Sequence, residues 1–160
     1  AFDACLQTAP NDFPYPWQYL GEIALVHGDA KNARDHFERA VAIDDHCVRA
    51  LSYLAFLENE RPQDALPRAR RALELAPGSM FIRFVFGLAA LANGLKEDAL
   101  ESMRLVAQDE GPNRVEARFY MGLAYKKLGQ LREAREAWEA GLKEKPDHEK
   151  ASQELLQLDD

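Results

Sequence analysis

Residues 117–146 read ARFYMGLAYKKLGQLREAREAWEAGLKEKP, and this stretch decides the fold. Its first half carries apolar or small side chains at i, i+4, i+7 and i+11, which are Ala117, Met121, Ala124 and Leu128. This spacing predicts one face of a helix. Gly129-Gln130 interrupts the pattern, and a second stripe follows before Pro146, made of Leu131, Ala134, Trp138, Gly141 and Leu142. The stretch therefore predicts two helices joined by a short turn.

Three residues in this stretch indicate how the two helices pack. Small residues at Gly122 and Ala134 let the helices approach closely, and the large Trp138 fills the gap beside them. This combination is typical of an antiparallel helix pair with a short connection.

The same pattern repeats along the chain. Gly21, Ala55, Gly87 and Gly122 are separated by 34, 32 and 35 residues, and Ala33, Ala65, Ala99 and Ala134 by 32, 34 and 35. A third series, Pro10, Asp45, Pro77, Gly111 and Pro146, steps by 35, 32, 34 and 35. In all three series, the interval that contains the segment between Ala55 and Ala65 is the short one, at 32 residues. A fixed period of this length indicates a helical repeat protein.

The composition agrees with a helical, soluble protein. The chain has 160 residues, of which 47% are hydrophobic and 29% charged, and its formal net charge is -7. It contains 25 Ala and 21 Leu but only 10 Val, Ile and Thr together, which favours helix over strand. The excess of acidic residues argues against nucleic acid as a partner, and no apolar run is long enough for membrane insertion.

The repeat resembles the tetratricopeptide repeat. The family pattern of Trp, Leu-Gly, Tyr, Ala, aromatic and Pro is matched by Trp17-x-x-Leu20-Gly21 with Ala33-x-x-x-Phe37, and by Met121-Gly122-x-x-Tyr125 with Ala134-x-x-x-Trp138 and Pro146. Asp45 stands where Pro is usual, and Arg83 where Trp or Leu is expected. The resemblance implies an all-α, right-handed superhelical solenoid of antiparallel helix pairs.

On this resemblance we expect one array over residues 1–160. Residues 1–13 would be the second half of a truncated repeat, followed by repeats at 14–47, 48–79, 80–114 and 115–148, the second of them short, and by a capping helix at 149–160. In the second repeat we expect Asp64 to be the N-cap of a helix, so that Pro67 falls in its first turn. Asp147 is the expected N-cap of the last helix.

The sequence contains no recognisable catalytic or metal-binding motif. The four histidines form no metal-ligand pair, and no glycine-rich phosphate loop occurs. Asp44-Asp45-His46-Cys47 fits a polar turn between helices better than a metal or nucleophile site. We therefore expect no enzymatic activity, no metal and no cofactor. Arg68, Arg70 and Arg71, with Arg61 nearby, form a basic stretch that is either a solvated helix face or a site for an acidic partner or phosphate.

The first helix of each repeat carries more apolar side chains than its core stripe needs. A helix that is apolar on two sides must be covered by a neighbour or must bind something. In the resembling family the first helices line a concave groove where peptides bind, so we expect a peptide-binding groove at Tyr15, Tyr19, Tyr53, Phe56, Phe81, Phe84, Leu88, Phe119, Tyr120 and Leu123.

These observations favour a non-catalytic protein–protein interaction scaffold that binds an apolar or amphipathic peptide segment of another protein in its concave groove. Two alternatives remain. The array could recruit substrates or partners for a longer enzyme such as a transferase, or it could form a homo-oligomer through its open N-terminal half-repeat. A cytoplasmic location is slightly favoured, and a periplasmic one would follow if a signal sequence had been removed.

Overall fold

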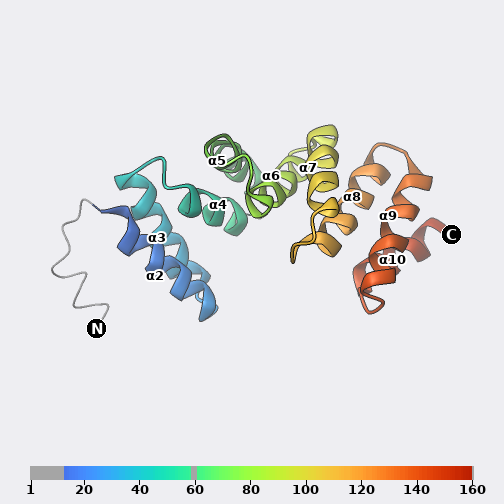
Figure 1. The fold of residues 1–160 in the computed structure, drawn as a ribbon, viewed down its shortest axis with the longest axis horizontal. Helices are drawn as coiled ribbons and strands as arrows, with labels where there is room; N and C mark the ends of the chain where they lie inside the picture. The colour runs from blue at the N-terminus through green and yellow to red at the C-terminus, as the bar shows by residue number, and fades with distance from the viewer. Residues whose placement is uncertain (1–12, 59–60, 160) are drawn as a thin grey trace. The chain divides into compact units, whose positions relative to one another are not determined.

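The computed structural model describes residues 13–58 and 61–159, and this part of the chain contains nine α-helices and no strand (Figure 1). The predicted all-α fold class is confirmed. The predicted half-repeat at residues 1–13 lies almost entirely outside the described residues.

The chain divides between Pro77 and Gly78 into two compact units, which we describe separately. The helices of the N-terminal unit are α2 (Pro14–Val26), α3 (Ala30–Ile43), α4 (Val48–Leu57) and α5 (Pro62–Leu75). Those of the C-terminal unit are α6 (Met80–Ala92), α7 (Lys96–Gln108), α8 (Arg114–Lys127), α9 (Leu131–Glu144) and α10 (Glu149–Asp159).

Within each unit the helices pack in consecutive pairs, α2 with α3 and α4 with α5 in the first, α6 with α7 and α8 with α9 in the second. Inside each unit the first helices of neighbouring pairs are also in contact: α2 with α4, and α6 with α8. The last helix, α10, packs against α9.

Close packing of small against large side chains holds the pairs together. A Cβ placed on Gly122 would lie 2.2 Å from Nε1 of Trp138, and one placed on Gly21 would lie 2.5 Å from Cε1 of Phe37, so a larger residue at either position would force the aromatic ring to move. The indole of Trp138 is fully buried and donates a hydrogen bond of 3.0 Å to the carbonyl oxygen of Phe119. The expected packing of Trp138 beside Gly122 is confirmed.

The start of α5 differs from the prediction. The helix begins at Pro62, with Arg61 in the N-cap position, so Asp64 lies in its first turn and is not the N-cap. Pro62 at the first helical position needs no backbone donor, which explains the earlier start. Pro67 consequently lies inside the helix. Both Pro67 and Gln63, whose carbonyl loses its helical donor, are exposed, so water can solvate that carbonyl.

The prediction of Asp147 as the N-cap of the last helix was also wrong. The backbone N–H of Ala151 donates to Nδ1 of His148 at 3.2 Å, and the carbonyl of His148 accepts from the first turn of α10. The His148 ring is buried, and its centroid lies 5.1 Å from that of the Phe119 ring. His148 therefore caps α10, and its ring also packs against α8.

Candidate peptide-binding surface

Four large, exposed apolar side chains of the N-terminal unit lie along α2. Tyr15, Tyr19, Ile23 and Val26 are 61%, 48%, 42% and 85% exposed. Their spacing of i, i+4, i+8 and i+11 places them on one face of the helix, while Gly21 lies buried on another face. We call these four residues the α2 row. A contiguous row of exposed apolar side chains typically marks an interaction site.

Two hollows border this row. One, of about 430 Å³, is lined by Tyr19, Glu22, Ile23, Val26 and His27. The other, of about 320 Å³, lies where α2 meets the start of α4 and is lined by Tyr15, Gln18, Tyr19, Asp44, His46, Cys47, Val48 and Arg49. Tyr19 borders both hollows, so a single bound segment can contact both.

A chain of polar contacts joins α2 to α4 beneath the second hollow. The Cys47 thiol donates to Oε1 of Gln18 at 3.3 Å, and the Gln18 amide donates to Oε1 of Glu22 at 3.2 Å. Arg49 then donates to Oε2 of Glu22 at 2.9 Å. Burial raises the pKa of the Cys47 thiol, so the thiol stays protonated and acts as a donor rather than as a nucleophile.

The two predicted residues of α4 differ in exposure. Phe56 is 39% exposed. Tyr53 is half-buried, and its ring stacks on that of Phe37 with centroids 5.1 Å apart. Tyr53 therefore supports the core of the N-terminal unit while one edge of its side chain remains accessible.

In the C-terminal unit the predicted groove residues are less exposed. Phe84 and Phe119 are each 6% exposed and belong to the hydrophobic core. Tyr120 packs edge-on against both rings, with centroids 5.9 Å from Phe84 and 5.1 Å from Phe119. Burial, and secondarily the charge of Glu116, raises the pKa of the Tyr120 phenol. The remaining predicted residues of this unit are half-buried: Phe81, Leu88 and Leu123.

The turn at Asp44, Asp45 and His46 brings three ligand-type atoms within 4.8 Å of one another. Nδ1 of His46 lies 2.6 Å from Oδ1 of Asp45, and its Nε2 lies 3.0 Å from Nη2 of Arg71. Because a guanidinium group already lies against this ring, the arrangement disfavours a second cation, and we assign no metal to it.

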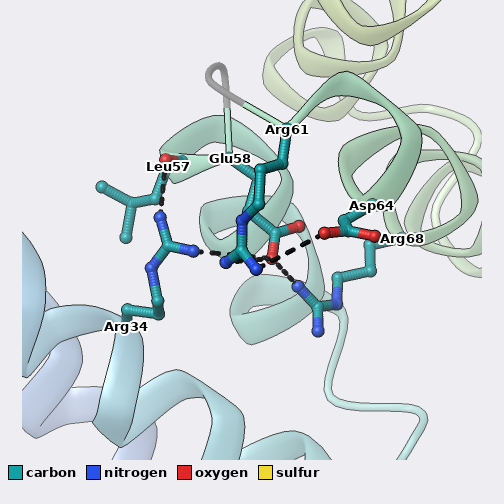
Figure 2. A network of polar contacts seen from close by, with 6 residues as sticks. All are labelled: Arg34, Leu57, Glu58, Arg61, Asp64 and Arg68. Atoms are coloured by element: carbon teal, nitrogen blue, oxygen red, sulfur yellow. Dashed lines mark hydrogen bonds and ion pairs between the residues drawn. The ribbon is translucent and has the colours of Figure 1, made fainter.

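A polar network that the sequence did not predict surrounds Glu58, the residue after α4. Its side chain is only 1% exposed. Figure 2 shows the guanidinium groups of Arg34, Arg61 and Arg68 directed toward its carboxylate, and Asp64 beside Arg61. The sequence showed that Arg61 and Arg68 belong to a basic stretch. It did not show that Glu58 is buried and forms ion pairs with them.

Sequence reasoning also missed Ile23, Gln18 and Glu22. Ile23 could have been found from its spacing of four residues from Tyr19. The hydrogen bond between Gln18 and Glu22 joins residues four apart on α2, so helical spacing could have indicated it as well. Their contacts with Cys47 and Arg49 form only because the start of α4 packs against α2, and no pattern in a single sequence reports those contacts.

Two family models match the chain, both described as tetratricopeptide repeat, over residues 54–115 and 115–148. Repeats of this family are generally non-catalytic scaffolds for binding proteins or peptides. No described helix has both the length and the apolar character needed to cross a bilayer. A search of curated proteins finds no match.

Solved structures with a similar fold agree with this family assignment. YrrB, a TPR protein with an unusual peptide-binding site, is 25% identical with a TM-score of 0.79, covering 95% of this chain and 78% of YrrB. MamA is 22% identical with a TM-score of 0.74, covering 94% and 88%. The pilF protein of Pseudomonas aeruginosa is 22% identical with a TM-score of 0.68, covering 81% and 60%. With its paired helices, its small-against-large packing and these matches, the chain belongs to the tetratricopeptide repeat family.

Proposed function

We propose that this chain is a non-catalytic protein–protein interaction scaffold and that it binds an apolar or amphipathic peptide segment along its first helices. The exposed α2 row carries this proposal. Each of its side chains leaves about half of its surface or more in water, and covering that surface stabilises a complex by about 1 kcal/mol per side chain.

The surroundings of the α2 row support a peptide as the ligand. The row runs along one helix for nearly its whole length, which suits an extended or helical segment better than a small compact molecule. Tyr15 and Tyr19 each present an apolar ring and a hydroxyl group, a combination common in peptide-binding surfaces. The similarity to YrrB supports the same class of ligand.

Within the predicted groove we give the largest energetic role to Tyr15, Tyr19 and Phe56. These are exposed in the unbound chain, and a partner can cover them without disturbing the core. Phe84 and Phe119 would act mainly by supporting Tyr120, which packs against both of them.

The experiment that tests the proposal selects peptides from a displayed random library on the wild-type chain and measures their affinities by calorimetry. We expect the recovered peptides to be apolar or amphipathic. The double variant Tyr19→Ala/Ile23→Ala should bind them at least about 30-fold more weakly, the loss typical of interface hot spots.

Leu131→Ala is the matched control, because Leu131 is also apolar and 51% exposed but lies on α9 in the other unit. It should leave the affinities unchanged. Equal affinity of the wild type and the double variant, or no recovered peptide at all, would contradict the proposal.

Self-association is a second candidate, because the α2 row could equally cover itself against a second copy. Light scattering over a wide range of protein concentrations separates the two. A mass that rises with concentration in the wild type, but stays constant in Tyr19→Ala/Ile23→Ala, would favour self-association over peptide binding.

A further inference from the structure

The middle of the α2 row is open at positions that are covered in the first helices of later pairs. The repeat spacing places Tyr19 of α2 at the same position as Tyr53 of α4 and Tyr120 of α8. Tyr19 is 48% exposed, whereas Tyr53 and Tyr120 are half-buried. Because the three residues are of the same type, the difference in exposure reflects what lies against each of them.

In both later pairs the cover includes the second helix of the pair before. The ring of Tyr53 stacks on that of Phe37 from α3, with centroids 5.1 Å apart. Tyr120 packs against a buried cluster to which α7 contributes Met103 and Val106. Among residues 13–58 and 61–159 no helix precedes α2, so this part of the chain supplies no such cover for Tyr19.

Neighbouring positions of α2 show the same difference. Ile23 is 42% exposed, whereas its counterpart Leu57 in α4 is half-buried and Ala124 in α8 is fully buried. Pro16 is half-buried, whereas its counterpart Ala50 in α4 is fully buried. The open surface of α2 thus corresponds to the contact that one helix pair makes with the next, and the element that fills this contact elsewhere in the chain is a helix.

The two covering helices share a spacing of buried side chains. Each presents a large apolar residue with smaller ones four residues before it and three after it: Ala33, Phe37 and Ala40 in α3, and Ala99, Met103 and Val106 in α7. This spacing places all three on one face of a helix. On α2 the hollow of about 430 Å³ beside Tyr19 and Ile23 offers space for the large residue of an incoming helix.

We propose that the α2 row binds an amphipathic α-helix of another protein, which packs on α2 as α3 packs on α4. The inference rests on the proposed function and narrows its ligand to a helix with a defined spacing. A second copy of the chain does not offer such a helix from its described part, because the large residues of α3, α7 and α9 are already buried in their own pairs. Phe37, Met103 and Trp138 are all 0% exposed.

The test measures by calorimetry how the full chain binds two synthetic peptides, residues 29–44 and 95–109, which reproduce α3 and α7 with their N-cap residues. We expect both peptides to bind and to gain helical circular dichroism on binding, because helices of this length are marginal on their own. A Glu38→Pro version of the first peptide keeps its apolar residues but breaks the helix, so it should bind at least about tenfold more weakly. A Glu38→Ala version, which changes the same exposed position, should bind at least as well as the unmodified peptide.

In the chain, Tyr19→Ala/Ile23→Ala should weaken the binding of both peptides at least about tenfold, and Leu131→Ala should leave it unchanged. Undiminished binding by the double variant, or equal binding of the Glu38→Pro peptide, would overturn the inference. The same holds if library peptides bind through Tyr19 and Ile23 but neither helix peptide binds. That last result would leave the proposed function intact, whereas a library without binders would count against the proposed function itself.

The chain's own residues 1–12, which lie outside the described residues, are the competing source of an apolar segment. Phe2 stands eight residues before Pro10, as Phe37 stands eight residues before Asp45. A Phe2→Asp variant of the full chain should bind the two helix peptides as the wild type does. Binding about tenfold tighter than that of the wild type would show that the chain's own segment competes for the α2 row, which would overturn the assignment to another protein.

Discussion

Two kinds of turn join the helices of a pair in this chain. The turns after α2, α6 and α8 contain Gly28, Gly94 and Gly129 with φ of 75°, 79° and 78°. The N–H of Leu95, which follows Gly94, donates to the carbonyl of Ala90 at 2.9 Å, and equivalent hydrogen bonds form at the other two turns. Glycine adopts this left-handed conformation without strain, so the backbone alone closes these turns.

The turn between α4 and α5 has no such glycine in its described part. α4 has 10 residues, whereas α2 and α6 have 13. The chain leaves α4 at Glu58, whose buried carboxylate faces the guanidinium groups of Arg34, Arg61 and Arg68. The N–H of Arg61 donates to the Glu58 carbonyl at 2.8 Å. Side-chain charge thus holds the turn after the short helix α4, where the other turns use backbone conformation. The two kinds of turn should therefore respond to different perturbations.

The largest expected effect is that of Glu58→Gln. Removing the charge leaves the guanidinium groups of Arg34, Arg61 and Arg68 facing one another without a buried anion. We expect the free energy of unfolding, measured by urea denaturation, to fall by about 2–3 kcal/mol, somewhat less than for a fully buried pair because the arginines are partly exposed.

Glu38→Gln is the control for this variant, because Glu38 is an exposed glutamate of α3 in the same unit. Its effect should stay within about 0.5 kcal/mol. If the two variants had equal stabilities, the network would not hold the turn, and the comparison between the two kinds of turn would lose its basis.

Gly94→Ala should have a smaller effect, about 1 kcal/mol, which is the cost of a left-handed conformation for a residue with a Cβ. No atom lies within 4 Å of the Cβ that alanine would add, so the effect isolates backbone strain from steric overlap. Gly78→Ala is the matched control, because Gly78 has equally open surroundings but no positive φ. A loss of stability as large in Gly78→Ala would show that strain is not the cause.

The same comparison explains which parts of the molecule could be predicted from its sequence. The spacing of Gly122 and Trp138 predicted their contact, because a small and a large side chain at fixed positions of a helix pair leave one way to pack. The burial of Glu58 could not be predicted. It depends on arginines at positions 34, 61 and 68, which converge only after α3, α4 and α5 have packed.

The candidate surface was predictable in the same partial sense. The apolar excess of the first helices identified Tyr15, Tyr19 and Phe56, which are exposed. It equally identified Phe84 and Phe119, which are buried, because apolar spacing reports that a helix face needs a cover and not whether the cover is a neighbouring helix or a partner.

Salt should distinguish the two kinds of turn more finely. The Debye length falls from about 10 Å at 0.1 M salt to about 3 Å at 1 M, which weakens partly exposed charge pairs. The destabilisation caused by Glu58→Gln should therefore shrink by about 0.5 kcal/mol in 1 M NaCl. The destabilisation caused by Gly94→Ala should not change, because strain in φ carries no charge. Equal shifts in both variants would indicate a general effect of salt on the fold instead.

The smallest expected effect concerns the helices that leave these turns. α3 begins after Gly28 with Asp29 as its N-cap, and the carboxylate accepts the backbone N–H of Asn32 at 3.1 Å. This hydrogen bond lowers the pKa of Asp29 below its ordinary value of 3.8, and a second hydrogen bond, from the Asn32 side chain, makes a smaller contribution in the same direction. α5 begins at Pro62, and its N-cap residue, Arg61, makes no side-chain capping hydrogen bond.

Because the pKa of Asp29 is lower in the folded chain than in the unfolded chain, its contribution to stability is present above pH 3.8 and is lost as the pH falls through the folded value. NMR titration should accordingly place the midpoint of the Asp29 carboxyl below 3.8, with the amide of Asn32 shifting at the same pH. Asp29→Ala should abolish that shift. A midpoint at or above the ordinary value would mean that α3 starts, like α5, without a charged cap. The two kinds of turn would then differ in the turn residues but not in the way the following helix is capped.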